Sequence, residues 1–498
     1  MADSRWRSPH VPHTEAIVLL PELPSSADVR GRPRFEEKWA RALSSWGVTS
    51  GGPATAGANG LLVVARARDA VASGAEVVLV DGRDRARRLT RAGYQVRTYV
   101  ARRSGQGSVM LTPVQRVRLG RAVRSRACKR ERGDVFCVRP GRRTTLLARH
   151  ARTPRQVLIA GVRAATGRHY LTVAHRDVAT PALVRSAVEA GAGGHVTLIA
   201  GGGLRRRSTL LVSPENDARP HIAVKVAPAS WADRGLKEQD VLRRLHTTGV
   251  ETHAPRPLGS GLLGPFAWSA ETAASGRPLA EVVASTRHST NIQSVLEDLA
   301  SWFTELGAAT RTVRTWSGED GLALRGEHRG LSAVRAALSD VPGVLVHGDV
   351  GTGLNVLVDR RSFNVIDWET AAVAELPLTD LLPLACQALA LSTGHRSPED
   401  AGHYILELCA GKTPESRWLL SVVDRYCREL QIPPEQVGAL ASLAWGYQAS
   451  MRLVHDELIV QEGGVAVPWT TAADSVARNW ITYEGLGLSW PALTEGRF

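Results

Sequence analysis

The sequence predicts two domains: an α/β domain over residues 1–190, and an α+β domain over residues 192–498 whose small β-rich lobe (about 192–275) precedes a helical lobe (about 276–498). A chain of 498 residues is too long for one hydrophobic core. Strand and helix patterns alternate in the first part, whereas strand hairpins and then long helical periodicity fill the second. Charge divides the chain in the same way, because residues 1–210 carry a net charge of +24 within a whole-chain charge of +14.

The N-terminal part contains apolar runs of the type found in buried strands, alternating with helical patterns. In chain order these segments are 60–64 (strand), 70–74 (helix), 76–80 (strand), 83–92 (helix) and 95–100 (strand), with further strands at 156–160 and 170–174. This order predicts a parallel, Rossmann-like sheet. Asp81 follows the second strand, where such folds place a ribose contact. The glycine fingerprint is missing after the first strand, so the sequence favours a substrate- or partner-positioning domain, or a decayed enzyme domain.

Arginine dominates the charge of this basic domain, notably in residues 83–91 and 116–132. Such runs raise the question of nucleic acid or another anionic surface as a partner. Because lysine is almost absent from them, a genome biased toward arginine codons explains them as well. Nucleic acid is therefore not the expected partner.

Composition indicates an ordinary globular protein, with 43% apolar and 22% charged residues. No run reaches the roughly eighteen apolar residues of a membrane span, and the first residues lack the apolar core of a signal peptide. The five cysteines are odd in number and have no CxxC spacing, so neither a disulfide scaffold nor a structural zinc site is expected. These observations predict a cytoplasmic protein without a membrane partner.

Among the polar residues of the stretch 344–369, two carboxylates and one carboxamide, Asp349, Asp367 and Asn355, lie next to short apolar runs. The pattern predicts a strand at 344–346, a loop, and a hairpin of 355–358 with 364–366. Asp349, Asn355 and Asp367 then sit at strand-to-loop junctions facing one cleft. Such a site offers a carboxylate that can orient a hydroxyl and oxygen ligands for Mg²⁺ on a nucleoside triphosphate.

The segment that precedes these residues in the chain contains a predicted hairpin and a lysine that could bind phosphates. Strands at 195–200 and 208–212 flank a turn of three glycines at 201–203, which makes a hairpin able to lie over phosphates. The next strand, 221–226, holds Lys225 among apolar neighbours. Glu238, placed at the start of a helical stretch with one apolar face, is its expected counter-charge.

These segments resemble aminoglycoside phosphotransferases and choline kinase relatives, which share the protein kinase-like fold. The resemblance lies in HGD at 347–349, the asparagine followed by VLV at 355–358, IDWE at 366–369, PRPLG at 255–259 and GRPL at 276–279. It implies that Asp349 is the catalytic aspartate and that Asn355 and Asp367 bind Mg²⁺. His347 would brace the loop. Asp349 and Asn355 are six positions apart, where the family has five, and the extra residue falls in the glycine-bearing stretch 350–353.

The same resemblance implies a nucleotide site. Lys225 contacts the phosphates and is held by Glu238, while the turn with Gly202 and Gly203, together with Ser208, covers the triphosphate. Backbone groups from 269 to 272, a stretch that includes Glu271, read the adenine edge.

The C-terminal remainder is predicted to be helical, with segments at 400–408, 417–430 and 437–456. Asp380 is expected to cap a helix that supports the catalytic loop. By the resemblance these helices form the acceptor pocket. Asp424, Asp456 and Glu457 are possible contacts for a cationic acceptor, although a solvated helix face is favoured. The aromatic residues Trp445, Tyr447 and Trp469 could stack on a sugar, although a core position is favoured.

The predicted function is transfer of the γ-phosphate of ATP or GTP, with Mg²⁺, to a hydroxyl of a small molecule such as an amino sugar or amino alcohol. The net charge of −10 over residues 211–498 suits a cationic acceptor. Two alternatives remain open: a peptide Ser/Thr kinase of a biosynthetic pathway, and a nucleotide-binding pseudokinase or scaffold.

Overall fold

The structure is a computed structural model that describes the strands of the N-terminal part and most of residues 219–461. Outside these, it describes only a few isolated helical positions; within 219–461 the gaps are 230–231, 265, 286–289, 317–333, 336–337, 339 and 360–361. The chain divides into two compact units. We call residues 1–235 and 258–273 the sheet unit, and residues 236–257 and 274–498 the helical unit. The domain boundary near residue 190 stays a prediction.

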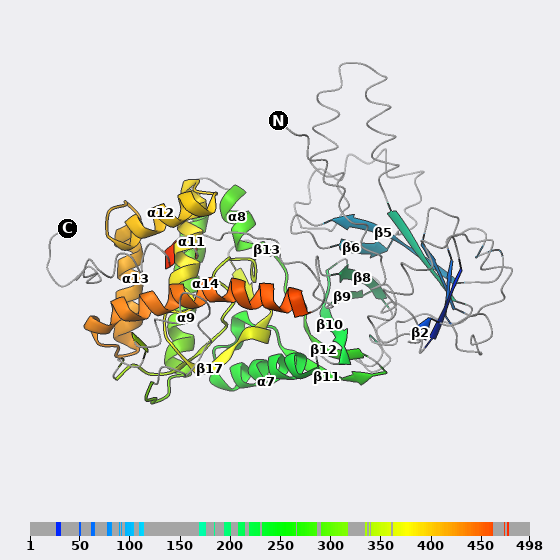
Figure 1. Cartoon of the computed structure of the whole chain (residues 1–498), viewed down its shortest axis with the longest axis horizontal. Helices are drawn as coiled ribbons and strands as arrows, with labels where there is room; N and C mark the ends of the chain where they lie inside the picture. The colour runs from blue at the N-terminus through cyan, green and yellow to red at the C-terminus, as the bar shows by residue number, and fades with distance from the viewer. Residues whose placement is uncertain are drawn as a thin grey trace, which may run out of the picture. The chain divides into compact units, whose positions relative to one another are not determined.

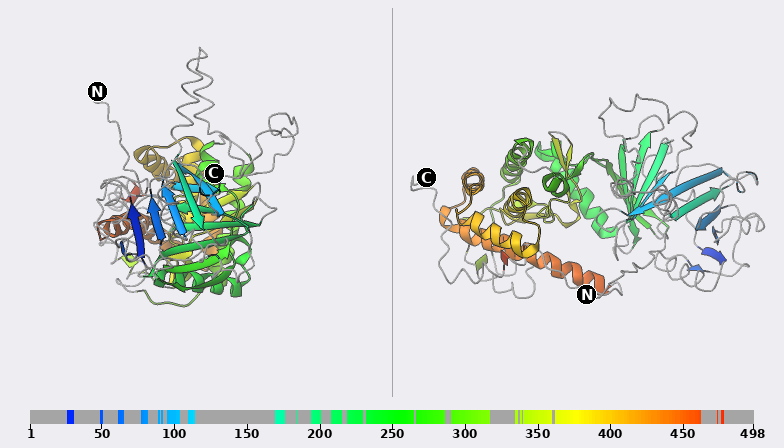
Figure 2. Two further views of the ribbon diagram at one scale, coloured as in Figure 1. Left: turned by 90° about the vertical axis from the view of Figure 1, so that its right-hand side faces the viewer. Right: turned by 90° about the horizontal axis from the view of Figure 1, so that it is seen from above.

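The sheet unit is built on one twelve-stranded sheet, whose strands lie side by side in Figure 2. Its strands are β1 (Ser26–Arg30), β2 (Thr49–Ser50), β3 (Leu61–Val64), β4 (Val77–Asp81), β5 (Gln95–Arg103), β6 (Val109–Pro113), β7 (His169–His175), β8 (Gly194–Ala200), β9 (Ser208–Pro214), β10 (Ile222–Pro228), β11 (Pro257–Leu263) and β12 (Phe266–Thr272). The order across the sheet is β11-β12-β10-β9-β8-β6-β5-β7-β4-β3-β1-β2.

Strand direction in the first part differs from the predicted Rossmann-like sheet. Strands β1 to β4 pair in parallel, as predicted for the first two apolar runs. Strand β5 instead lies antiparallel to β7, and β7 lies antiparallel to β4, so that Asp81 pairs with Leu171. The sheet is therefore mixed, and a Rossmann-like domain is not supported. An apolar run indicates that a strand is buried on both faces, but its neighbours decide its direction. The predicted strand at 156–160 lies outside the described residues.

Strands β8 to β10 and β12 form the antiparallel part of the sheet. The predicted hairpin of β8 and β9 is confirmed, and β10 pairs with β9 on one side and β12 on the other. Burial alternates along β9, where Ser208, Leu210 and Val212 are buried and their neighbours are half-buried. This period of two assigns each side chain to one face of the sheet.

The helical unit contains α7 (Ala232–Thr248), which starts six residues before Glu238 and not next to it as predicted. Asp233 lies in its first turn, where a carboxylate interacts favourably with the helix dipole. Among the residues that the structure describes, the other helices of eight residues or more in this unit are α9 (Thr290–Ala309), α11 (Leu381–Thr393), α12 (Pro398–Cys409), α13 (Ser416–Glu429) and α14 (Val437–Gln461), which group together in Figure 1. The predicted segments 400–408, 417–430 and 437–456 are thus confirmed as helices.

Short strands of the helical unit lie between α7 and α11 along the chain. They are β13 (Arg277–Pro278), β14 (Val344–Val346), β15 (Val356–Asp359), β16 (Ser362–Val365) and β17 (Ala372–Glu375), and α8 (Leu279–Ser285) follows β13. The predicted hairpin is confirmed, because β15 and β16 are antiparallel with Val356 opposite Val365. Strand β14 has its predicted bounds and pairs with β17.

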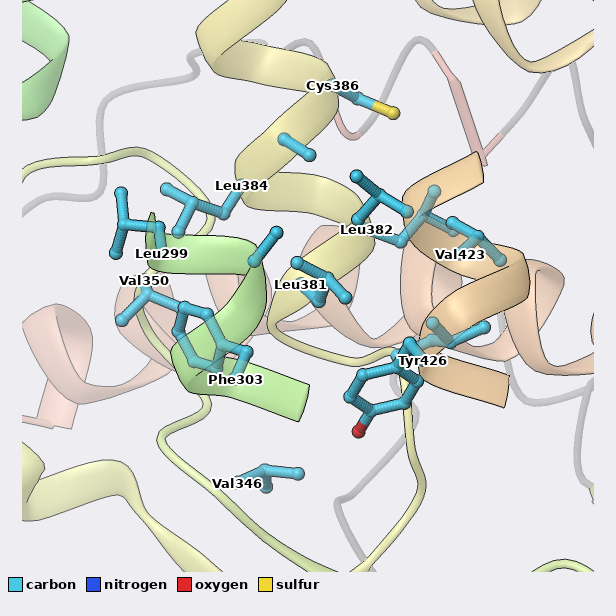
Figure 3. Packing of buried hydrophobic residues seen from close by; sticks show 14 of the residues in the cluster. Leu299, Phe303, Val346, Val350, Leu381, Leu382, Leu384, Cys386, Val423 and Tyr426 are labelled. Carbon is cyan, nitrogen blue, oxygen red and sulfur yellow. The ribbon is translucent and has the colours of Figure 1, made fainter. Parts of the chain in front are cut away.

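One apolar cluster fills the helical unit. Val350, in the loop between β14 and β15, lies in this cluster with Leu299 and Phe303 of α9 and with residues of α11 (Figure 3). Trp445 and Tyr447 are buried, in agreement with the favoured core position. Trp469 and the side chains of 456 and 457 lie outside what the structure describes, as do most residues of the two arginine-rich runs. Among the helices that are described, none combines the length and apolarity needed to cross a bilayer.

Candidate active site

The predicted catalytic loop, defined as residues 347–355, begins with a histidine that acts as a brace. The Nδ1 atom of His347 accepts a hydrogen bond from the backbone N–H of Asp349 at 3.2 Å. The ring therefore carries its proton on Nε2, which donates to the carbonyl oxygen of Ile366 at 2.9 Å. With both nitrogens engaged and the ring against Trp368, His347 links the loop to the segment before Asp367.

Asp380 holds the start of the catalytic loop. It occupies the N-cap position of α11, but its side chain makes no capping hydrogen bond, which corrects the predicted role. Its two carboxylate oxygens instead accept the backbone N–H groups of His347, at 2.6 Å, and Gly348, at 2.9 Å. Burial raises the pKa of Asp380, while the two backbone N–H donors oppose that rise. The sequence offered no signal for this contact, which spans more than thirty residues.

The extra residue of the loop is absorbed in a turn. The N–H of Gly353 donates to the carbonyl oxygen of Val350 at 2.8 Å, and Gly353 has a φ of +67°, which a glycine adopts without strain. Val350 is buried, whereas Leu354 is partly exposed. The ends of the loop still meet, because Asn355 Nδ2 donates to the backbone oxygen of Asp349 at 2.8 Å and to its Oδ2 atom at 3.1 Å.

Asp367 is brought beside this pair by the β15–β16 hairpin. The N–H of Ile366 donates to the carbonyl oxygen of Asn355 at 2.9 Å, which closes the hairpin next to Asp367. Asp367 itself adopts the left-handed conformation, with φ 71° and ψ 57°. Such a conformation costs a non-glycine residue about 1–2 kcal/mol and concentrates at functional sites. The structure thus brings Asn355 into contact with Asp349, and it places Asp367 directly after a residue that is hydrogen-bonded to the backbone of Asn355.

The available donor atoms suit a hard divalent cation. Both hydrogen bonds of Asn355 use its amide nitrogen, so the side-chain oxygen is the atom that can bind a metal. Asp367 adds a carboxylate directly after Ile366, the residue that is hydrogen-bonded to the backbone of Asn355. Carboxylate and amide oxygens are preferred ligands of Mg²⁺, which also keeps several waters and phosphate oxygens. The residues present therefore fit this cation.

Glu238 is completely buried on α7. Its Oε1 atom accepts the backbone N–H of Trp368 at 3.0 Å. This contact joins α7 to the residue that follows Asp367, within the helical unit. The carboxylate that was predicted as the counter-charge of Lys225 is a backbone acceptor here, and its pairing with Lys225 stays a prediction.

In the sheet unit, Lys225 forms an ion pair on its own sheet. Its Nζ atom lies 3.0 Å from Oε1 of Glu271 on β12. The strand register places Thr209 opposite Lys225 and Ser208 opposite Val226, so Thr209 shares the face of Lys225 and Ser208 does not. Only the pairing of β9 with β10 reveals this position of Thr209. Gly202 and Gly203 lie outside the described residues.

Comparison with known families matches residues 195–405 to the phosphotransferase enzyme family. This segment, with its antiparallel strands followed by helices, is thus a kinase-like phosphotransferase enzyme domain, as the sequence resemblance implied. None of the curated proteins searched matches the chain.

Solved structures of aminoglycoside phosphotransferases are similar to about half of the chain. APH(3'')-Id from Streptomyces rimosus is 17% identical, with a TM-score of 0.33, over 50% of this chain and 90% of that one. An aminoglycoside-3'-phosphotransferase of type VIII is 22% identical, with a TM-score of 0.25, over 48% and 90%. A GDP complex of an aminoglycoside 2'-phosphotransferase of type IIIa is 13% identical, with a TM-score of 0.29, over 50% and 95%.

Proposed function

We propose that the part of the chain from about residue 192 onward, whose residues 195–405 match the phosphotransferase enzyme family, transfers the γ-phosphate of ATP or GTP to a hydroxyl of a small molecule. The observation that supports this most is the contact of Asn355 with Asp349 despite the longer loop. It keeps a base and a metal ligand side by side.

The proposed chemistry assigns the proton to Asp349. The acceptor oxygen forms a bond to the γ-phosphorus while the bond from that phosphorus to the bridging oxygen of the nucleoside diphosphate breaks, and the hydroxyl proton passes to the Asp349 carboxylate. Most of the rate enhancement in such reactions comes from positioning and charge stabilisation. The brace by His347 and the anchor by Asp380 supply that positioning for the loop.

The proposed ligands follow the predicted set. Mg²⁺, which neutralises phosphate charge when bound, would be held by Asn355 and Asp367. Lys225 would bind the nucleotide phosphates. The remaining predicted nucleotide contacts, which are also part of this proposal, are Gly202, Gly203, Ser208, Glu238 and Glu271.

The proposed acceptor is a small molecule with a basic group, such as an amino sugar or amino alcohol. The support is the net charge of −10 over residues 211–498. A cytoplasmic location is part of the same proposal. The three cysteines described by the structure are buried free thiols, which suits a reducing compartment.

The test is a release assay for nucleoside diphosphate with Mg²⁺ and either ATP or GTP. Acceptors are amino sugars, amino alcohols, nucleosides and short serine- or threonine-containing peptides, each compared with a blank without acceptor. We expect acceptor-dependent turnover in the wild type and a loss of about 10³-fold or more for Asp349→Asn. Asp240→Asn, a change at an exposed carboxylate of α7 that pairs with Arg243, serves as the matched carboxylate control.

The outcomes separate the alternatives. Turnover only with peptides would identify a peptide kinase, and nucleotide binding without turnover would identify a pseudokinase or scaffold. Full activity of a folded Asp349→Asn variant would refute the assignment of the base.

A further inference from the structure

The ion pair of Lys225 and Glu271 lies inside the sheet unit and is almost fully buried. The two residues are 8% and 3% exposed, and the charged atoms are 3.0 Å apart. In the antiparallel pairing of β10 and β12, Lys225 is opposite Ser269 and Ala223 is opposite Glu271. Lys225 and Glu271 are therefore diagonal neighbours on the same face of the sheet, within reach of long side chains.

This geometry limits the freedom of the lysine side chain. An ammonium on a flexible four-carbon stem can occupy many positions unless a partner fixes it. Glu271 is attached to the neighbouring strand, so the distance between the two backbones is set by the sheet ladder. A buried charge without a partner is strongly unfavourable, and this keeps the two groups together.

We propose that Glu271 is the positioning residue that holds the ammonium of Lys225 ready for the nucleotide phosphates. The proposal rests on the proposed function, since it needs Lys225 to bind phosphate. It assigns Glu271 a role through its carboxylate, whereas the sequence resemblance pointed only to backbone groups of this strand. The helix residue Glu238 differs from Glu271, because its carboxylate accepts a backbone N–H of the helical unit.

Preorganisation of the lysine determines whether a substitution of Glu271 should lower or raise the affinity for the nucleotide. If Glu271 fixes the ammonium, its removal costs nucleotide affinity, because binding must then order the side chain. If Glu271 merely competed with phosphate for the ammonium, its removal would increase the affinity.

The experiment is a double-mutant cycle on nucleotide affinity. Dissociation constants for ATP and GTP with Mg²⁺ are measured by calorimetry on the full chain, for the wild type, Glu271→Gln, Lys225→Met and the double variant. We expect each single variant to bind the preferred nucleotide about tenfold more weakly. The double variant should match Lys225→Met within about twofold, because Glu271 acts only through the lysine. Glu297→Gln, a carboxylate on α9 paired with Arg425, is the control with unchanged affinity.

Several results would overturn the proposal. Unchanged or tighter nucleotide binding by Glu271→Gln would do so. A double variant that binds nucleotide about tenfold more weakly than Lys225→Met would also do so, because Glu271 would then act independently of the lysine, in a merely structural role. If Glu271→Gln does not fold, the double variant is expected to fold, because it leaves no buried charge without a partner. A double variant that is less stable than either single one would contradict the pairing. A wild type that binds neither nucleotide would instead overturn the proposed function itself.

Discussion

Replacing Asp380 by alanine should loosen the catalytic loop and destabilise the helical unit. The carboxylate accepts the N–H groups of His347 and Gly348, and all three residues are buried. Alanine removes both acceptors, so two buried donors lose their partner at the first turn of the loop. Asparagine keeps one oxygen but turns an N–H donor toward the other backbone N–H.

The magnitude follows from those two hydrogen bonds. Each buried donor left without a partner costs about 1–3 kcal/mol, so Asp380→Ala should lower the free energy of unfolding by about 2–6 kcal/mol. Asp380→Asn should lose about half as much or less. It leaves one donor unsatisfied, but it also removes a buried charge, whose cost is visible in the raised pKa of Asp380.

Urea unfolding followed by circular dichroism measures these differences. The control is Asp424→Ala, whose carboxylate pairs with exposed Arg428 on the outside of α13 and should change stability by about 0.5 kcal/mol or less. Equal midpoints for Asp380→Ala and Asp424→Ala would refute the anchoring role. In the release assay, Asp380→Asn should turn over about 10²-fold more slowly, since small displacements of a catalytic loop are costly.

Three further predictions concern strain, ionisation and the metal. Gly276 has a φ of +127°, and an added Cβ would lie 2.8 Å from the carbonyl carbon of Val358, whereas at Gly394, with φ +103°, nothing lies within 4 Å. Gly276→Ala should therefore lower the free energy of unfolding by about 1–3 kcal/mol more than Gly394→Ala does, which thermal unfolding detects as a lower melting temperature. Equal melting temperatures for the two variants would contradict the contact. Burial, and then a hydrogen bond to Glu415, raises the pKa of Tyr404 to about 12 from its usual value of 10.0. The stability from that neutral hydroxyl is complete below pH 10 and is lost as the pH rises through about 12. The unfolding free energy of the wild type should thus fall relative to that of Tyr404→Phe over this range, and a constant difference would refute the shift. Finally, EDTA should stop nucleoside diphosphate release, and Mg²⁺ should restore it better than Ca²⁺, which prefers more ligands at longer distances.

Local patterns predicted the segments around the candidate site closely. Strand β14 has the bounds that its apolar run indicated, and the β15–β16 hairpin connects Asn355 to the residue before Asp367. Both are short-range features, because a strand of alternating burial and its return strand are encoded by adjacent residues. The longer loop after Asp349 was also visible in the sequence. That the added residue leaves Asn355 in contact with Asp349 was not visible, since it depends on a turn and on the burial of Val350.

Contacts between distant segments were beyond the reach of such patterns. The carboxylate of Asp380 was expected at a helix cap, but it binds backbone groups more than thirty residues away. Strand β5 was expected to be parallel to its neighbours, but it is antiparallel to β7. Periodicity indicates which face of an element is buried, and it does not say which other element covers that face.

The sequence by itself determined the chemical content of this protein: two carboxylates and a carboxamide spaced around a hairpin, a lysine within an apolar strand, and long amphipathic helices after them. Only the tertiary structure decided the partners. It placed Glu271 beside Lys225, Trp368 beside Glu238, and Thr209 opposite Lys225. The physical reason is that residue type and spacing act along the chain, whereas a partner is chosen by strand register and by packing between segments that the chain brings together from far apart.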